Sequence, residues 1–165
     1  PVRGEPGVLT GSGIFHGSNH DKAGSTPLPE GIKIRYARQE NPPRRKCGEV
    51  SEAYIGGAVE KVRLGKCRSL ELSLDEYNEE SCLLLESSSE LIFLQICVED
   101  GTAWACYNPE FSDSGQEAPI EPSDGQSVFP MKCTMRDREL AVKCVEWRVR
   151  TLEPCPGMDW LRDTR

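Results

Sequence analysis

The sequence predicts an α+β fold: a disulfide-stabilised antiparallel β-sheet of about four strands or more, with a packed helix and long loops. Three observations lead to this prediction. Eight dispersed cysteines in 165 residues are typical of a disulfide framework. One segment carries apolar residues at helical spacing. Several later segments alternate apolar and polar residues, as half-buried strands do.

The cysteines predict an extracellular protein. Their number is even and none lies close enough to another for a Cys-x-x-Cys metal site. We therefore expect disulfides, and hence a secreted chain in which Pro1 lies downstream of a removed signal peptide or of an artificial boundary. The connectivity stays open. The eight residues are Cys47, Cys67, Cys82, Cys97, Cys106, Cys133, Cys144 and Cys155.

Residues 1–29 are rich in Gly, Ser and Pro and predict a flexible N-terminal extension, followed by one domain over 30–165. His16 and His20 have helical metal-ligand spacing, but no histidine follows them and no third ligand is apparent. We expect no metal and no cofactor. The basic run at residues 44–46 is interpreted as a basic turn or as a dibasic processing site.

The elements of the domain follow from periodicity. Ile32–Tyr36 alternates as a strand, and Ser51–Arg63 is the best helix, with Ser51 as its N-cap. Asp100-Gly101 predicts a two-residue hairpin in which Val98 faces Ala103 and Cys97 faces Trp104. Cys97 and Cys106 would then share one face of the sheet. The remaining predicted strands are Leu70–Leu74, Cys82–Glu86, Leu91–Val98, Thr102–Tyr107 and Leu140–Thr151.

The segment Asn108–Gln126 is long, polar and interrupted by three prolines. Loops of this length are uncommon unless they are functional or mobile. We therefore predict a mobile recognition loop that a rigid cross-linked sheet holds in position. Its candidate recognition residues are Asn108, Glu110, Phe111, Asp113, Gln116, Glu117 and Asp124.

Charge and composition argue against several function classes. The net charge is −7, and residues 69–131 contain fourteen acidic residues without a Lys or Arg. Such a stretch argues against nucleic-acid binding, which needs clustered cations. A core without histidine disfavours Ser–His hydrolysis and ribonuclease chemistry, and no phosphate-binding loop is present. No apolar run is long enough to span a membrane. We therefore expect that this protein is not an enzyme.

The most distinctive segment is Val145–Arg150. On the predicted strand, Trp147 and Val149 enter the core, while Arg148 and Arg150 point the other way. The two arginines would pair with the acidic 69–131 region or lie across the sheet surface, in preference to contacting a partner directly.

The residues Trp147, Arg148, Val149 and Arg150 match the pattern Trp-Arg-[Phe/Leu/Val]-Arg. In this motif, and in its cysteine number, length and α+β pattern, the chain resembles the LARS family of effectors secreted by plant-pathogenic fungi. The resemblance covers roughly residues 47–155 and implies a non-enzymatic virulence protein of the plant apoplast. Its expected partner is a host protein or a plant immune receptor, which would make it an avirulence-type effector, and we expect a monomer.

A second hypothesis is a secreted hydrolase inhibitor or a carbohydrate-binding module. Such a module needs an exposed loop or an aromatic platform. Trp104 and Trp160, with Tyr54 or Tyr107, are the candidates for that platform.

Overall fold

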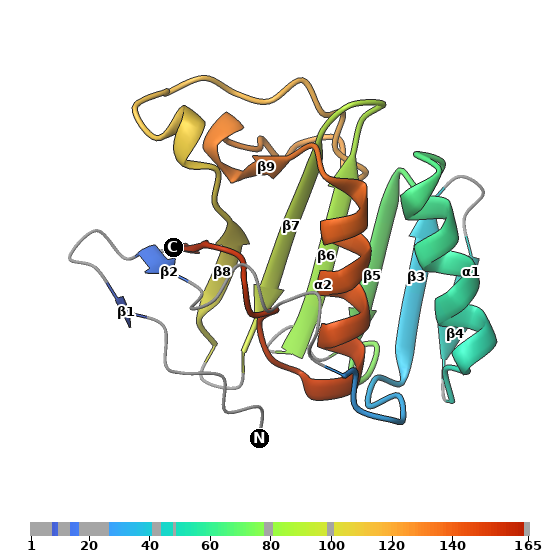
Figure 1. Ribbon diagram of the computed structural model, residues 1–165. Coiled ribbons are helices and arrows are strands. Elements are labelled where there is room, and N and C mark those ends of the chain that lie inside the picture. The colour runs from blue at the N-terminus through green and yellow to red at the C-terminus, as the bar shows by residue number, and fades with distance from the viewer. Residues whose placement is uncertain are drawn as a thin grey trace.

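Figure 1 shows the chain in a computed structural model, which describes residues 8–9, 14–16, 27–40, 44–47, 49–77, 81–98 and 101–163. The predicted α+β class is confirmed. The strands are β1 (Val8–Leu9), β2 (Ile14–His16), β3 (Tyr36–Glu40), β4 (Arg44–Cys47), β5 (Ser69–Ser73), β6 (Cys82–Ser87), β7 (Ile92–Cys97), β8 (Ala103–Cys106), β9 (Thr134–Met135) and β10 (Trp160–Asp163). The helices are α1 (Glu52–Arg63) and α2 (Arg138–Thr151), with short 3-10 turns η3 (Pro109–Phe111) and η4 (Met131–Cys133).

The strands form one open antiparallel sheet in the order β1-β2-β10-β8-β7-β6-β5-β3-β4, and β9 adds to the end of β7. Consecutive strands β5, β6, β7 and β8 form a meander, because each connects to its spatial neighbour. Strand β3 lies between β4 and β5. The last strand in the sequence, β10, lies inside the sheet, because it pairs with both β8 and β2.

Both helices lie on the same face of the sheet, with α2 in front of its centre and α1 beside it (Figure 1). The predicted helix is confirmed as α1. The Ser51 side chain accepts a hydrogen bond from the Tyr54 N–H at 3.1 Å, and Gly65 follows the helix with a left-handed φ of 72°. Its buried residues are the four with helical spacing, Ile55, Ala58, Val59 and Val62.

The predicted strand Leu140–Thr151 is wrong, because this segment is the helix α2. The carboxylate of Asp137 caps it by accepting the Leu140 N–H at 3.1 Å. Fourteen residues are long for a strand and ordinary for a helix. The alternation of Val145, Trp147 and Val149 is a local coincidence inside a segment that is buried around much of its circumference.

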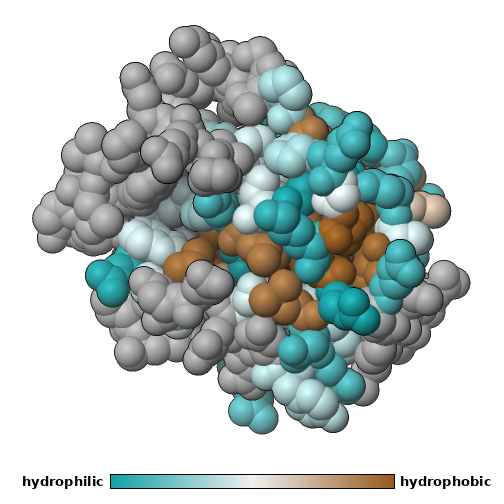
Figure 2. Space-filling view, turned by 90° about the horizontal axis from the view of Figure 1, so that it is seen from below, coloured by the Kyte–Doolittle hydropathy of each residue, from teal (hydrophilic) through white to brown (hydrophobic). Residues whose placement is uncertain are grey.

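The helix-covered face of the sheet, here called the inner face, holds the main core. Leu70, Leu72, Leu83, Leu85 and Leu94 are at most 1% exposed there. Their neighbours on α1 and α2 complete one continuous apolar cluster. Figure 2 views the molecule from below and shows apolar residues reaching the surface in the middle of that side, among hydrophilic ones. Partly buried hydrophobic residues packed against this core are Ile32, Tyr54, Val98, Trp104, Leu140 and Leu152.

The hairpin between β7 and β8 has a different register from the predicted one. Cys97 faces Ala103, and the Val98 N–H donates to the Thr102 carbonyl at 3.0 Å, so three residues rather than two separate the paired positions. Gly101 accommodates this longer turn with a φ of 80°. One residue of shift exchanges the faces of a strand. Cys97 and Cys106 therefore lie on opposite faces of the sheet.

Two further strand predictions differ in extent. The alternation at Ile32–Tyr36 predicts the burial of Ile34 and Tyr36 correctly, but β3 begins only at Tyr36. Residues 44–46 belong to the edge strand β4 and not to a turn. In the N-terminal extension, the backbone of β1 and β2 forms a short hairpin that adds to β10, and most of residues 1–26 lies outside the described residues.

Candidate functional site

Trp147 and Val149 of the motif are buried in the inner core, as predicted, although they project from a helix. Trp147 is 3% exposed. On a helix, the intervening residue Arg148 does not point to the opposite side as it would on a strand. It is also buried, with 1% of its surface exposed. The motif is therefore part of the packing that joins α2 to the sheet.

Arg148 connects the end of α2 to the end of β7. Its Nη1 donates to the carbonyl oxygen of Leu152, and its Nη2 donates to the carbonyl oxygen of Cys97. Leu152 ends the helix in a left-handed conformation, with a φ of 61°, which a leucine rarely adopts. Burial lowers the pKa of Arg148 to about 10. The guanidinium thus donates hydrogen bonds to a backbone carbonyl at the end of α2 and to another at the end of β7.

Arg150 joins the two helices. Its guanidinium donates to both carboxylate oxygens of Glu52, at 2.7 Å each, and to Glu146 one turn earlier on α2, at 3.0 Å. The hydrogen bonds to Glu52 raise the pKa of Arg150. The predicted partners of the arginines were wrong: Arg150 pairs with carboxylates outside the 69–131 region, and Arg148 binds carbonyl oxygens.

The face of the sheet opposite the helices, here called the outer face, is covered by the long loop. The loop continues beyond residue 126 to Cys133, and its buried apolar residues pack on β7 and β8. Phe129 stacks on Phe93 of β7 with ring centroids 4.5 Å apart. The segment that was predicted to be a polar loop thus also contributes buried apolar side chains to the molecule. The buried apolar residues between 108 and 133 are Ala118, Ile120, Phe129, Met131 and Cys133.

The loop is also held by hydrogen bonds. The Ala118 N–H donates to the Phe129 carbonyl at 2.7 Å, and the Met131 N–H donates to the Gln116 carbonyl at 2.9 Å. These bonds pair the loop's two arms with each other. Beside them, the Asn108 side chain caps η3 by accepting the Glu110 N–H at 3.1 Å. The loop therefore has a defined conformation above the sheet.

A buried carboxylate fixes the far end of this loop. Glu86 projects from β6 on the outer face and is 3% exposed. One of its oxygens accepts hydrogen bonds from the backbone N–H and the hydroxyl of Ser123, while the other is buried without a partner. Burial raises the pKa of Glu86, against the opposing effect of these hydrogen bonds and of Arg38 nearby. Glu86 thus ties the loop to the sheet.

Most of the predicted recognition residues lie at the surface of the loop. Five side chains are exposed: Glu110, Asp113, Gln116, Glu117 and Asp124. Asn108 and Phe111 are half-buried, because Asn108 caps η3 and Phe111 packs against the outer cluster. Hydrogen bonds from Ser127 and Gln126 lower the pKa of Asp124 to about 2.

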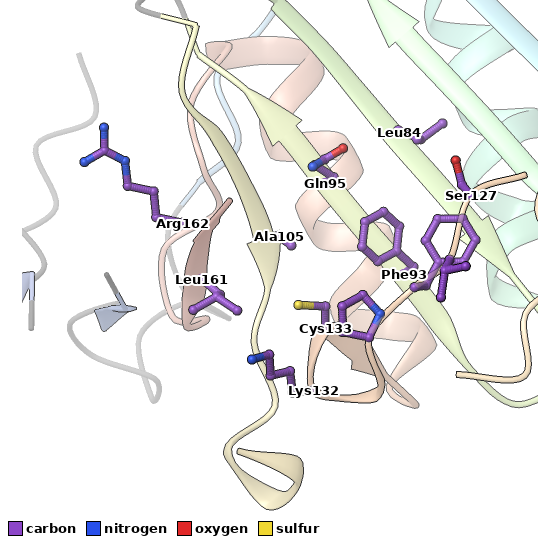
Figure 3. Close-up of a pocket in the computed structure, with 12 residues that line it drawn as sticks. Leu84, Phe93, Gln95, Ala105, Ser127, Lys132, Cys133, Leu161 and Arg162 are labelled. Atoms are coloured by element: carbon purple, nitrogen blue, oxygen red, sulfur yellow. The ribbon is translucent and has the colours of Figure 1, made fainter. Parts of the chain in front are cut away.

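Between the loop and the sheet lies a cleft of about 540 Å³ (Figure 3). Figure 3 shows Phe93, Gln95 and Ala105 on its sheet side and Ser127 and Cys133 on its loop side. Lys132 and Leu161 lie at the end of the cleft next to β10, and Arg162 extends away from it. At the rim, Val128 is 58% exposed. No pattern in the sequence predicts this cleft, because its walls join segments that are far apart in the chain.

The seven cysteines whose side chains are described form no S–S bond with one another. Several nevertheless lie in pairs. The Sγ atoms of Cys82 and Cys97 are 3.9 Å apart, and the side chains of Cys144 and Cys155 interact directly. Cys106 donates to the carbonyl oxygen of Cys133 at 2.9 Å. Disulfide formation thus stays a prediction, and the structure shows which cysteines are neighbours.

The alternative sites receive less support. Trp160 is 1% exposed and donates its indole N–H to the Cys155 carbonyl, so it cannot contribute to an exposed aromatic platform. Trp104, Tyr54 and Tyr107 are all half-buried. Among the described residues, no group of three or more His, Cys, Asp or Glu side chains is arranged to hold a metal ion. His20 and the side chain of His16 lie outside the described residues.

The sequence matches no known protein-family profile, and a search of curated proteins gives no match. Within the described part of the chain, neither helix combines the length and the apolar character that crossing a membrane requires.

Proposed function

We propose that this protein is a secreted, non-enzymatic effector of a plant-pathogenic fungus, which acts by contacting a host protein or an immune receptor. The contact surface is the loop Asn108–Gln126 together with the cleft beside it. The protein works as a monomer in the apoplast and needs no metal or cofactor.

The loop's position is the observation that carries this proposal. A long irregular segment is anchored at Phe129 and Ser123 and exposes several acidic side chains to solvent. Rigidly positioned loops are common recognition elements, because the scaffold limits the entropy lost on binding. No Lys or Arg lies between residues 108 and 126, so the surface attracts a basic partner.

The cleft supplies the apolar part of such a contact. Its walls include Phe93, Leu84 and Leu161, and Val128 projects beside it. Interfaces commonly combine an apolar centre with a polar rim. A partner segment with one bulky apolar side chain next to Lys or Arg therefore suits both the cleft and the acidic loop.

The resemblance of the Trp147–Arg150 motif to the LARS effector family supports the biological setting. In this chain the motif residues have structural contacts: Trp147 packs in the core, Arg148 joins α2 to β7, and Arg150 joins α2 to α1. A motif that holds the fold together would be retained by related effectors while their loops diverge. This supports the loop as the variable, partner-specific surface.

The test is the response of host tissue to the purified protein. Folded protein is infiltrated into leaves of a panel of genotypes of the host plant, beside the same protein reduced and unfolded. A genotype-specific immune response to the folded form alone supports an avirulence-type effector. A measurable hydrolytic activity on glycan, nucleic acid or protein substrates, or binding to a glycan array without any host response, would contradict the proposal.

A further inference from the structure

We propose that three disulfides, Cys82–Cys97, Cys106–Cys133 and Cys144–Cys155, cross-link the folded protein, and that Cys82–Cys97 is the bond that exchanges with external thiols of the glutathione class. Cys47 and Cys67 remain thiols. The disulfide framework expected from the eight cysteines thereby includes six of them.

Cys82 and Cys97 are neighbours on adjacent strands. The register of β6 and β7 pairs Leu83 with Ile96, and one further step places Cys82 directly opposite Cys97. Opposite residues of antiparallel strands have Cβ atoms about 4.5–5.5 Å apart, close to the separation that a disulfide needs. The Sγ atoms are already 3.9 Å apart. Rotation of the two side chains, with a small approach of the strand ends, therefore suffices to form the bond.

Cys144 and Cys155 are both 2% exposed, and a direct interaction joins their side chains. Cys144 belongs to α2, whereas Cys155 follows the helix in the segment that leads to β10. The bond would tie the helix to this segment. Cys106 also lies near Cys144, but Cys155 is the cysteine whose side chain hydrogen-bonds with Cys144.

Cys106 then has Cys133 as its neighbour. Its thiol donates to the Cys133 carbonyl at 2.9 Å, and the Asn108 N–H donates to the Lys132 carbonyl at 2.7 Å. Residues 106–108 and 132–133 therefore run side by side. A bond here would join β8 to the base of the long loop.

The backbone register keeps the last two cysteines apart. Cys47 of β4 lies opposite Tyr36, whereas Ser69 lies opposite Glu40, four residues further along β3. Four residues of strand span about 13 Å. Cys67 precedes Ser69 and lies further still from Cys47, on the far side of β3. A disulfide tolerates a Cα separation of at most about 7 Å. Burial raises the pKa of the Cys67 thiol to about 11, which makes it unreactive.

The three bonds differ in accessibility. Cys82 and Cys97 are half-exposed, whereas Cys106, Cys133, Cys144 and Cys155 are all buried. Thiol exchange requires a thiolate to reach one of the two sulfurs. The hydrogen bond with Cys97 and burial raise the pKa of the Cys82 thiol, and the guanidinium of Arg148 nearby opposes this rise only in part. Accessibility is what distinguishes this bond from the other two. Cys82–Cys97 is therefore the bond that external thiols reduce first.

The chemistry balances with a glutathione couple. Formation of each bond removes two protons and two electrons from two thiols, and oxidised glutathione takes them up as two glutathione molecules. In the reverse direction, a glutathione thiolate attacks one sulfur of Cys82–Cys97, and the other sulfur leaves as a thiolate. A second glutathione then releases the mixed disulfide. Opening the bond frees the end of β7 whose carbonyl holds Arg148.

Peptide mapping tests the connectivity. The full chain is folded in a mixture of reduced and oxidised glutathione, its remaining thiols are alkylated, and it is cleaved after glutamate without reduction. The glutamates separate all eight cysteines onto different peptides, whereas trypsin leaves Cys82, Cys97 and Cys106 together. We expect linked peptides for the three proposed pairs, with Cys47 and Cys67 alkylated. A Cys47–Cys67 link, or any other partner for Cys82, would overturn the assignment.

Timed reduction of the oxidised protein tests the exchange. Reduced glutathione is added under native conditions, and newly exposed thiols are labelled with a maleimide. We expect Cys82 and Cys97 to be labelled about tenfold or more faster than Cys144 and Cys155. Equal rates would contradict the selective exchange.

Paired variants provide the matched control. C82S/C97S should lack the fast phase and keep the slow one, whereas C144S/C155S should keep the fast phase. Retention of the fast phase in C82S/C97S would contradict the proposal. Should either variant fail to fold, the wild-type mapping and labelling decide.

Discussion

The two faces of one sheet are covered in different ways. On the inner face, two helices with 12 and 14 residues bury a continuous aliphatic cluster. On the outer face, an irregular loop buries a smaller cluster and leaves a cleft. Because side chains of a strand alternate between faces, the same strands contribute to both. In β7, Leu94 and Ile96 enter the inner core, while Phe93 and Gln95 face the cleft.

We propose that this difference separates stability from recognition. Helices satisfy their own backbone hydrogen bonds, so a helix-covered face can be filled with apolar side chains alone. A loop must satisfy its backbone groups through side chains and turns, which keeps polar groups at the surface. The inner face therefore carries most of the folding free energy, and the outer face carries the groups available to a partner. The predictions below test this division.

Replacement of Trp147 should have the largest effect on stability. Trp147→Ala leaves a cavity in the inner core and should lower the free energy of unfolding by about 3–5 kcal/mol. Chemical denaturation of the oxidised protein measures this loss. A loss below about 1 kcal/mol would show that the inner face is not where the stability resides.

Arg148 should be the next most important residue. Arg148→Ala leaves two partly buried carbonyl groups, those of Leu152 and Cys97, without their donor and should cost about 2–4 kcal/mol. Arg150→Ala is the matched control on the same helix, since it removes a half-exposed ion pair and should cost less. Equal losses in denaturation experiments would contradict the different environments of the two arginines.

Removal of the Phe129 ring should act locally. Phe129→Ala should detach the loop from Phe93 and speed amide hydrogen exchange at Ala118 and Met131, whose N–H groups bond across the loop. Exchange in α2 should change little. If protection is lost equally in α2 and the loop, the two faces unfold as one unit, and the proposed division fails.

Glu86 should give a small pH dependence. Burial raises its folded-state pKa above the ordinary value of 4.5, so the folded protein holds this proton to higher pH than the unfolded chain. The free energy of unfolding therefore falls as the pH rises from about 4.5 through the raised pKa. Glu86→Gln should remove this contribution. Melting temperatures of the wild type and of Glu86→Gln between pH 4 and pH 8 measure this contribution. A difference between the two melting temperatures that does not change with pH would contradict a raised pKa of Glu86.

The sequence predicted the inner face better than the outer one. Helix α1 followed from the spacing of Ile55, Val59 and Val62, and the strands β5 to β8 followed from apolar runs. Helix α2 was missed because its Val-Trp-Val alternation imitates a strand. Asp137 and Glu139 at its start, together with its length, were the signals for a helix.

The candidate site was predicted only in part. The exposed acidic residues of the loop could be identified from composition. The positions of Phe129 and Glu86 depend on contacts between segments far apart in the chain, which periodicity does not report. The burial of Arg148 could not be predicted from a motif assigned to a strand. A strand places it on the opposite side from Trp147, whereas a helix allows both to enter the core.

The most direct test of the division between the two faces is host recognition by two charge-reversal variants. E110K/D113K changes the exposed loop, and E30K/E49K makes the same charge change at exposed residues outside it. Both should keep the wild-type melting temperature. In a host genotype that responds to the wild type, we expect E110K/D113K to lose recognition and E30K/E49K to retain it. Retained recognition by E110K/D113K, with loss in E30K/E49K, would contradict the outer face as the recognition surface.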